Sequence, residues 1–264
     1  MNIPPGTPQI LVLVGVGAVV SFVNSISGGG SVLSLPLLML LGLPAAEANG
    51  TNRIGIWVGS AGSTLGFSRQ GLFYPGLTAR VALPGLAGVL AGSWTGVSLP
   101  DAVFKPVLAL VIGFVVFETV RSRRRGEEPD GSAAAGAAPS LPSGFLPSLV
   151  YAGIGFYAGF LQAGVGLIMM YAFSRLGKMN LLQINSLKGS ATLAFITLSL
   201  LIYGMQGKIR WDMALALALG NGLGGFAGSI MQVRRGEGFI RAFLAVSGTA
   251  LALKLLYDAA RALF

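Results

Sequence analysis

"NSISGGGS", residues 24–31, interrupts an apolar run that extends from Ile10 to Leu43. Apolar runs of this length are typical of membrane helices, in which three consecutive glycines flanked by serines have no obvious use. Irregular backbone at membrane depth is stable only where protein buries it or where it lines a wet cavity. Glycine adopts positive φ and lets a ligand approach the backbone closely. We therefore predict that residues 28–30 form the tip of a hairpin inside the membrane.

The composition of the whole chain supports a membrane protein. Of its 264 residues, 53% are apolar and 10% are charged, and the mean hydropathy is +0.75. In a soluble domain about a quarter of the residues are charged. Several apolar stretches reach the length of about 18–22 residues that a helix needs to cross the hydrocarbon core. Since Ala, Leu and Gly dominate and no β-type alternation is present, we predict an all-α polytopic membrane protein.

The chain contains no cysteine and no histidine. Disulfides, thiol chemistry and histidine-based catalysis or metal binding are therefore excluded. We expect no enzymatic activity, no metal and no cofactor. The net charge of +9 comes from basic residues between apolar segments, which is typical of cytoplasmic loops in membrane proteins rather than of nucleic-acid binding.

Two groups of apolar segments lie on either side of a charged, Pro-containing connector. We predict a first membrane repeat at 1–120, a flexible cytoplasmic linker at 121–144 and a second membrane repeat at 145–264. The predicted apolar segments are residues 9–26, 31–43, 50–68, 77–98, 102–120, 147–163, 167–177, 182–205, 211–232 and 238–257.

The two halves align without a gap at a spacing of 136 residues. This spacing places Gly28 on Gly164 and Asn49 on Asn185. Weak internal symmetry of this kind is typical of transporters built from repeats.

The number of crossings in each half decides whether the repeats are inverted or parallel. If the first two segments of each half form a hairpin that returns to the same face, three crossings remain and the second repeat is inverted. If those segments make one full and one partial crossing, each half has four crossings and the repeats are parallel. Segment 31–43 favours the hairpin, because about 13 residues rise only about 20 Å as a helix. The inverted scheme also leaves more basic residues in the cytoplasm. These are Arg69, Arg80, Arg121, Arg123, Arg124, Arg125, Arg175, Lys178, Arg234 and Arg235.

The hairpin tips and nearby polar residues form the predicted substrate site. The half-helix that begins at Ser31 points free N–H groups at the first tip, and these donors favour an anion. Arg53 and Lys188 lie near the starts of apolar crossings, where a charge indicates function, and a guanidinium matches an oxyanion. Snorkelling, hydrogen bonding between helices and close packing are the alternative roles. The predicted substrate-binding residues are Ser27, Gly28, Gly29, Gly30, Ser31, Asn49, Thr51, Asn52, Arg53, Gln162, Gly164, Gly166, Asn185 and Lys188.

Glycines at a spacing of four residues form two further faces. These are Gly88, Gly92 and Gly96 in the first half and Gly220, Gly224 and Gly228 in the second. For both faces we predict close helix packing rather than binding.

The stretch SGGGSVLSLPLLMLLGLPAAEANGTNRIG, residues 27–55, resembles the signature of the sulfite exporter TauE/SafE family of membrane transporters. Residues 164–190, GVGLIMMYAFSRLGKMNLLQINSLKGS, look like a weaker second copy of this signature. The resemblance covers nearly the whole chain. It implies a carrier of small sulfur-containing anions such as sulfite, sulfoacetate, thiosulfate or related sulfonates.

Sequence and resemblance together predict a multi-pass secondary transporter of the bacterial inner membrane that works by alternating access. An anion channel and a non-transporting membrane scaffold are the alternatives. We expect a small anionic substrate and the lipid bilayer as partners and no nucleic acid, and we leave a homodimer open.

Overall fold

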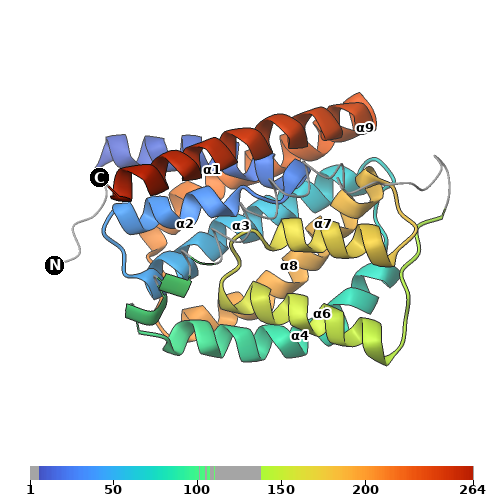
Figure 1. The fold of residues 1–264 in the computed structure, drawn as a ribbon, viewed down its shortest axis with the longest axis horizontal. Coiled ribbons are helices and arrows are strands. Elements are labelled where there is room, and N and C mark those ends of the chain that lie inside the picture. Colours follow the sequence, from blue (N-terminus) through green and yellow to red (C-terminus); the bar gives the residue numbers. More distant parts are fainter. Residues whose placement is uncertain (1–5, 101, 105, 108–109, 111–137, 264) are drawn as a thin grey trace.

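The computed structural model describes residues 6–100, 102–104, 106–107, 110 and 138–263, and in these residues the regular structure is helical. The first half contains α1 (Thr7–Ser27), α2 (Ser31–Leu40), α3 (Ala45–Ser68) and α4 (Pro75–Ser98). The second half contains α6 (Phe145–Phe160), α7 (Val165–Leu176), α8 (Leu181–Met205) and α9 (Trp211–Leu263) (Figure 1). The helices begin and end close to the predicted apolar segments.

Four helical stretches in the described part of the chain are long and apolar enough to cross a membrane: Pro8–Ser27, Pro75–Ser98, Leu181–Met205 and Trp211–Gly236. In contrast, α2 and α7 have only 10 and 12 residues, which rise about 15 and 18 Å and cannot cross alone. The chain is therefore an all-α polytopic membrane protein, as its composition predicts.

Both predicted hairpin breaks are present. Gly28 closes α1 with a φ of 76°, and Gly164 precedes α7 with a φ of 75°. These two glycines occupy equivalent positions in the repeat, and glycine enters this left-handed region without steric cost. One difference from the prediction is that α1, with 21 residues, is long enough to cross alone, whereas its counterpart α6 has 16.

The hairpins run in opposite directions through the molecule. In Figure 1, α1 starts at the left end beside the N-terminus, whereas α6 starts at the right end and runs back toward the middle. This course supports the predicted inversion; the inverted relation of the complete repeats stays a prediction.

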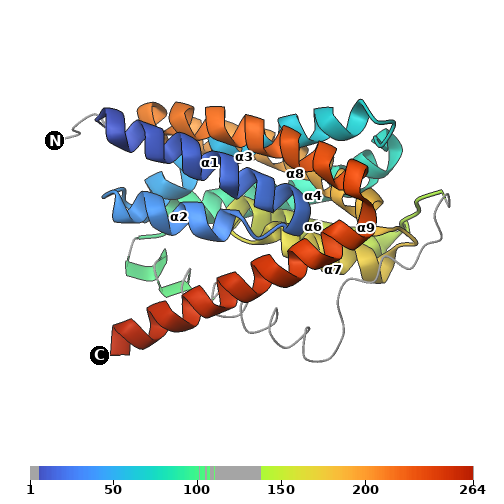
Figure 2. The same cartoon turned by 90° about the horizontal axis from the view of Figure 1, so that it is seen from above.

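The last helix, α9, is broken at Gly236, whose φ of 71° and ψ of −171° are not helical. Figure 2 shows the two parts of α9 leaving this point in different directions. The break separates the predicted segments 211–232 and 238–257, as expected. Most of the predicted segment 102–120, and the predicted linker up to residue 137, lie outside the described residues.

Glycine faces join the two halves. In α4, a Cβ on Gly88 would lie 1.9 Å from the carbonyl oxygen of Ala152 in α6. In α9, a Cβ on Gly220 would lie 1.9 Å from the carbonyl oxygen of Val14 in α1. The predicted packing role of these faces is confirmed. As a result, α1 packs along α9, and its counterpart α6 packs along α4.

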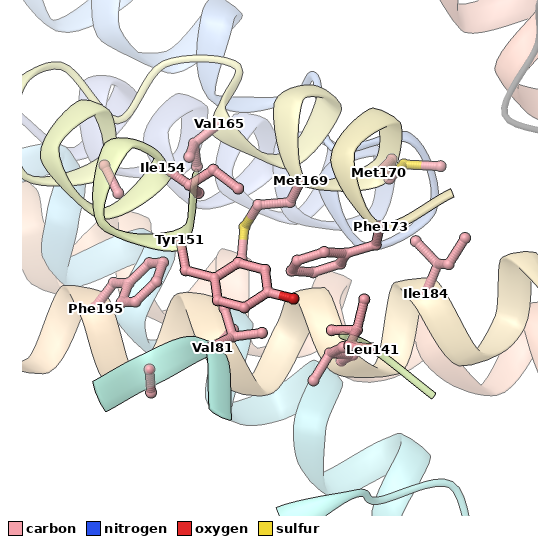
Figure 3. Packing of buried hydrophobic residues seen from close by; sticks show 14 of the residues in the cluster. Val81, Leu141, Tyr151, Ile154, Val165, Met169, Met170, Phe173, Ile184 and Phe195 are labelled. Carbon is pink, nitrogen blue, oxygen red and sulfur yellow. The ribbon is translucent and has the colours of Figure 1, made fainter. Parts of the chain in front are cut away.

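The largest apolar core lies between α4, α6, α7 and α8. Figure 3 shows how side chains from the four helices converge there, with Met169 and Phe173 of α7 on one side of Tyr151 and Phe195 of α8 on another. This core fixes the short helix α7, and with it the second hairpin tip, against the long helix α8.

Candidate functional site

The two hairpin tips touch each other through their backbones. A Cβ built on Gly28 would lie 2.4 Å from the carbonyl carbon of Gly166, and a Cβ on Gly166 would lie 2.5 Å from the Cα of Gly28. Neither position accepts a side chain, because the neighbouring atoms belong to the backbone and cannot rotate away. The glycines at these positions therefore allow the tips of the two repeats to meet.

Beside this contact, Lys188 of α8 binds the C-terminal end of α1. Its Nζ donates to the carbonyl oxygens of Asn24 at 3.0 Å and Ser25 at 3.1 Å. It also donates to Oδ1 of Asn185, one turn earlier on α8, at 2.7 Å. The last carbonyls of a helix lack partners within the helix and carry partial negative charge, so an ammonium is a suitable cap.

Arg53 of α3 makes the equivalent contact with the C-terminal end of α6. Its Nη1 donates to the carbonyl oxygen of Ala158 at 2.9 Å, and its Nη2 donates to that of Gly159 at 2.5 Å. The guanidinium also lies 4.3 Å from the centroid of the Tyr203 ring. The side chain is completely buried, with a relative exposure of 0%.

An asparagine accompanies each cation. Asn49 donates from Nδ2 to the carbonyl oxygen of Phe160 at 2.8 Å, and Asn185 donates from Nδ2 to that of Ile26 at 3.0 Å. Each asparagine also accepts a hydrogen bond from its own cation, Arg53 at 3.4 Å and Lys188 at 2.7 Å. Each half of the chain thus uses an Asn–cation pair to hold the first hairpin helix of the other half.

A small polar cavity of about 20 Å³ lies next to Lys188, between α1, α3, α7 and α8. The residues that line it are Ser21, Asn24, Ser25, Gly59, Ser60, Ser63, Val165, Gly166, Lys188, Gly189 and Thr192. Lys188 is the one charged residue among them. Because Val165 and Gly166 begin α7, the positive end of this helix also meets the cavity.

The equivalent place around Arg53 differs. By the repeat spacing, Ser21, Gly59 and Ser60 correspond to Tyr157, Phe195 and Ile196, which are larger and mostly apolar. Arg53 does not line the cavity. The internal symmetry therefore holds for the two helix caps, whereas the polar space lies on the Lys188 side.

The predicted site residues separate into three groups by their place in the structure: residues at the cavity or at the contact between the tips, residues of the tips and residues that hold the helix ends, and the remaining residues. Gly166 and Lys188 line the cavity, and Gly28 forms the contact between the tips. Gly29, Gly30 and Gly164 belong to the tips, and Asn49, Arg53 and Asn185 hold the helix ends.

The third group comprises Ser27, Thr51, Asn52, Gln162 and Ser31, and the first four of these do not line the cavity. Ser27 donates to the carbonyl oxygen of Val23 in its own helix at 3.0 Å, and Thr51 accepts a hydrogen bond from the backbone N–H of Arg210 at 3.0 Å. Asn52 and Gln162 are buried, and Oε1 of Gln162 has no hydrogen-bond partner in the described part of the chain. The side chain of Ser31 lies outside the described residues.

Sequence reasoning missed most of the hydroxyl groups around the cavity, namely Ser21, Ser60, Ser63 and Thr192. A signal for them was present, because Ser21 and Ser25 share one face of an otherwise apolar helix, as do Ser60 and Ser63. It was weak, since serine and threonine also hydrogen-bond within membrane helices without taking part in binding.

Comparison with known proteins gives a consistent result. The family model described as "Sulfite exporter TauE/SafE" matches residues 13–255. A "Probable membrane transporter protein ORF9" of Sinorhizobium sp is 27% identical over 245 residues, which cover 91% of this chain and 89% of that protein. A "Probable membrane transporter protein" of Haemophilus influenzae is 27% identical over 257 residues, with 96% of both chains covered.

A third relative, "Probable membrane transporter protein YfcA" of Escherichia coli K12, is 27% identical over 264 residues, which cover 96% of this chain and 91% of that protein. No solved structure matches the chain significantly. The relatives are bacterial membrane transporters by name, and the four candidate spans agree with a multi-pass protein of the bacterial inner membrane.

Proposed function

Because this chain belongs to the sulfite exporter TauE/SafE family of membrane transporters, we propose that it is a secondary transporter of small sulfur-containing anions. The substrate class comprises sulfite, thiosulfate, sulfoacetate and related sulfonates, carried across the bacterial inner membrane by alternating access. The observation that carries this proposal is the buried Lys188 ammonium in a hydroxyl-lined cavity beside the contact of the two hairpin tips.

The chemistry of the cavity supports an anionic substrate. Hydroxyl groups can donate to sulfonate or sulfite oxygens, and the ammonium of Lys188 supplies a positive charge. The start of α7 adds the partial positive charge of a helix N-terminus. In a water-poor interior these contributions are stronger than at a surface. We propose Lys188, Gly166, Ser21, Ser60 and Thr192 as the residues nearest to the bound anion.

The size of the cavity supports a moving carrier. A volume of about 20 Å³ holds about one water molecule. A sulfite or thiosulfate ion is larger than a water molecule, and we propose that the surrounding helices separate as the anion binds. The tip contact at Gly28 and Gly166 has no side chains to interlock, and it would allow one bundle to rock against the other.

A two-stage experiment tests the function. First, the unfolding temperature of the purified protein is measured with sulfite, thiosulfate, sulfoacetate or taurine. A ligand at 100 times its Kd stabilises the folded state by about 2.7 kcal/mol, which is easily detected. Second, uptake of the stabilising anion is measured in proteoliposomes containing the wild-type protein or Lys188→Gln. Lys178→Gln is the matched control, since it removes a positive charge from an exposed turn.

The proposal predicts saturable uptake by the wild-type protein and by Lys178→Gln, with accelerated exchange when the same anion is present on the other side. A channel would instead give flux without such exchange. If none of the four anions shifts the unfolding temperature or enters the liposomes, the proposed function is wrong.

A further inference from the structure

We infer that Lys188 couples anion binding to release of the first hairpin, whereas Arg53 is a positioning residue that keeps the second hairpin in place. The inference rests on the proposed function and assigns different roles to two cations that stand one position apart in the repeat alignment and make equivalent contacts with helix ends. It depends on the contacts of each cation and on the position of the cavity.

All three N–H groups of the Lys188 ammonium are used in the described structure. An ammonium carries three N–H groups, and three oxygens accept from it at 2.7–3.1 Å, those of Asn24, Ser25 and Asn185. A sulfur atom, Sδ of Met170, lies at 3.8 Å. An anion that enters the cavity and binds Lys188 must therefore take at least one N–H from these partners.

Once an anion is present, the hydrogen bonds from Lys188 to the carbonyls of α1 are the weakest of the three. The carbonyl of Asn24 already accepts from the backbone N–H of Gly28 at 3.0 Å, so it keeps a partner without Lys188. Asn185 lies on the same helix as Lys188 and can move with it. An anion beside the C-terminal end of α1 is also repelled by the partial negative charge of that helix end.

Loss of these bonds removes the Lys188 cap from the last turn of α1. A buried carbonyl without a partner is unfavourable, and Ser25 would become such a group. The first tip is held otherwise by the hydrogen bond from Asn185 to Ile26 and by the glycine contact with the second tip. Displacement of the end of α1 from α8 restores access to water and separates Gly28 from Gly166.

Arg53 is placed differently. It does not line the cavity, and its exposure is 0%. Its Nη1 and Nη2 donate to backbone carbonyls of α6, its guanidinium lies against the face of Tyr203, and its buried Nε has no hydrogen-bond partner in the described residues. An anion in the cavity beside Lys188 does not compete for these contacts. The end of α6 and the second tip therefore stay fixed while the end of α1 moves.

Hydrogen–deuterium exchange of the complete protein in lipid nanodiscs tests this asymmetry, with sulfite as the added anion. We expect sulfite to accelerate exchange in peptides that cover residues 22–30 and to leave peptides that cover residues 156–164 unchanged. A site that merely became ordered around its ligand would show slower exchange at residues 22–30, which would contradict the inference.

Two variants extend the test. In Lys188→Gln, residues 22–30 should exchange rapidly with or without sulfite, and the Kd for sulfite should rise by about tenfold or more, because a charge-assisted hydrogen bond is lost. In Arg53→Gln, exchange should increase at residues 156–164, whereas the sulfite response at residues 22–30 should persist. Loss of that response in Arg53→Gln would contradict the separate roles.

The outcome is distinguishable from failure of the proposed function. If wild-type liposomes take up sulfite but sulfite leaves exchange at residues 22–30 unchanged, the coupling role of Lys188 is wrong and the transporter assignment stands. Because this comparison uses the wild-type protein, it holds even if a variant does not fold. Lys178→Gln again serves as the charge control, and its exchange pattern should match that of the wild type.

Discussion

Gly28 and Gly166 come from opposite halves of the chain, and their backbones lie in direct contact, so that a Cβ on either would overlap the other. Their contact is the point at which the two hairpins meet. It has no side chain to interlock the tips and no space to admit one.

We expect Gly166→Ala to lower the free energy of unfolding by about 3 kcal/mol, as overpacking does, and to abolish anion uptake. The measurements are unfolding in mixed micelles and uptake in proteoliposomes. Gly28→Ala should have the same effects, and Gly71→Ala is its matched control. Gly71 has a φ of +75°, close to the +76° of Gly28, but nothing lies within 4 Å of its Cβ position. Gly71→Ala should therefore cost only about 1–2 kcal/mol and keep uptake. Wild-type stability of Gly166→Ala would refute the tip contact.

The glycine faces offer a second matched pair. A Cβ on Gly92 would lie 2.0 Å from the carbonyl oxygen of Phe156, whereas a Cβ on Gly153, inside α6, meets nothing within 4 Å. We expect Gly92→Ala to separate α4 from α6 and to lower the unfolding temperature. Gly153→Ala should be neutral or stabilising by up to about 1 kcal/mol, because alanine favours the helix. Equal effects of the two substitutions would argue against packing as the role of the face.

Tyr203 should contribute through both its ring and its hydroxyl. The hydroxyl accepts from Nδ2 of Asn49 at 2.9 Å, and the ring lies against the Arg53 guanidinium. We expect Tyr203→Phe to cost about 1 kcal/mol for the lost hydrogen bond. Tyr203→Leu should cost about 2 kcal/mol more, because the desolvated cation–π contact is also lost. Denaturant unfolding measures both values, and a leucine variant as stable as the phenylalanine variant would show that the stacking does not matter.

The absence of cysteine from the sequence makes a topology test direct. Gln70 and Gln206 are equivalent in the repeat, and each lies at the turn after a long helix. In inverted repeats the two turns face opposite sides of the membrane. In intact cells, a membrane-impermeant thiol reagent should therefore label only one of Gln70→Cys and Gln206→Cys. Labelling of both from one side would show that the repeats are parallel.

Local sequence patterns were sufficient for the helices. Apolar length predicted the long helices, and the glycines at 28–30 together with Gly164 and Gly166 predicted the breaks, because both signals act within one segment. The faces of Gly88 and Gly220 were predicted for the same reason, since a spacing of four residues aligns small residues on one side of a helix.

The functional roles of the two cations depended on contacts across the repeats. Sequence analysis placed Arg53 and Lys188 together as anion ligands, because each is a charge in an apolar segment. In the structure, Nη1 and Nη2 of Arg53 donate to carbonyls of α6, and Lys188 lies between α1 and the cavity. These partners are more than 100 residues away in sequence, at 158 and 24, and no local pattern specifies them.

The sequence by itself determined that this protein is a bundle of membrane helices with two matched interruptions, because hydrophobic length and backbone freedom are properties of short segments. Only the tertiary structure decided which helix end each cation holds and on which side a polar space remains. The physical reason is that carbonyls at a helix end and buried charges are satisfied by whatever group the packing brings within hydrogen-bonding distance.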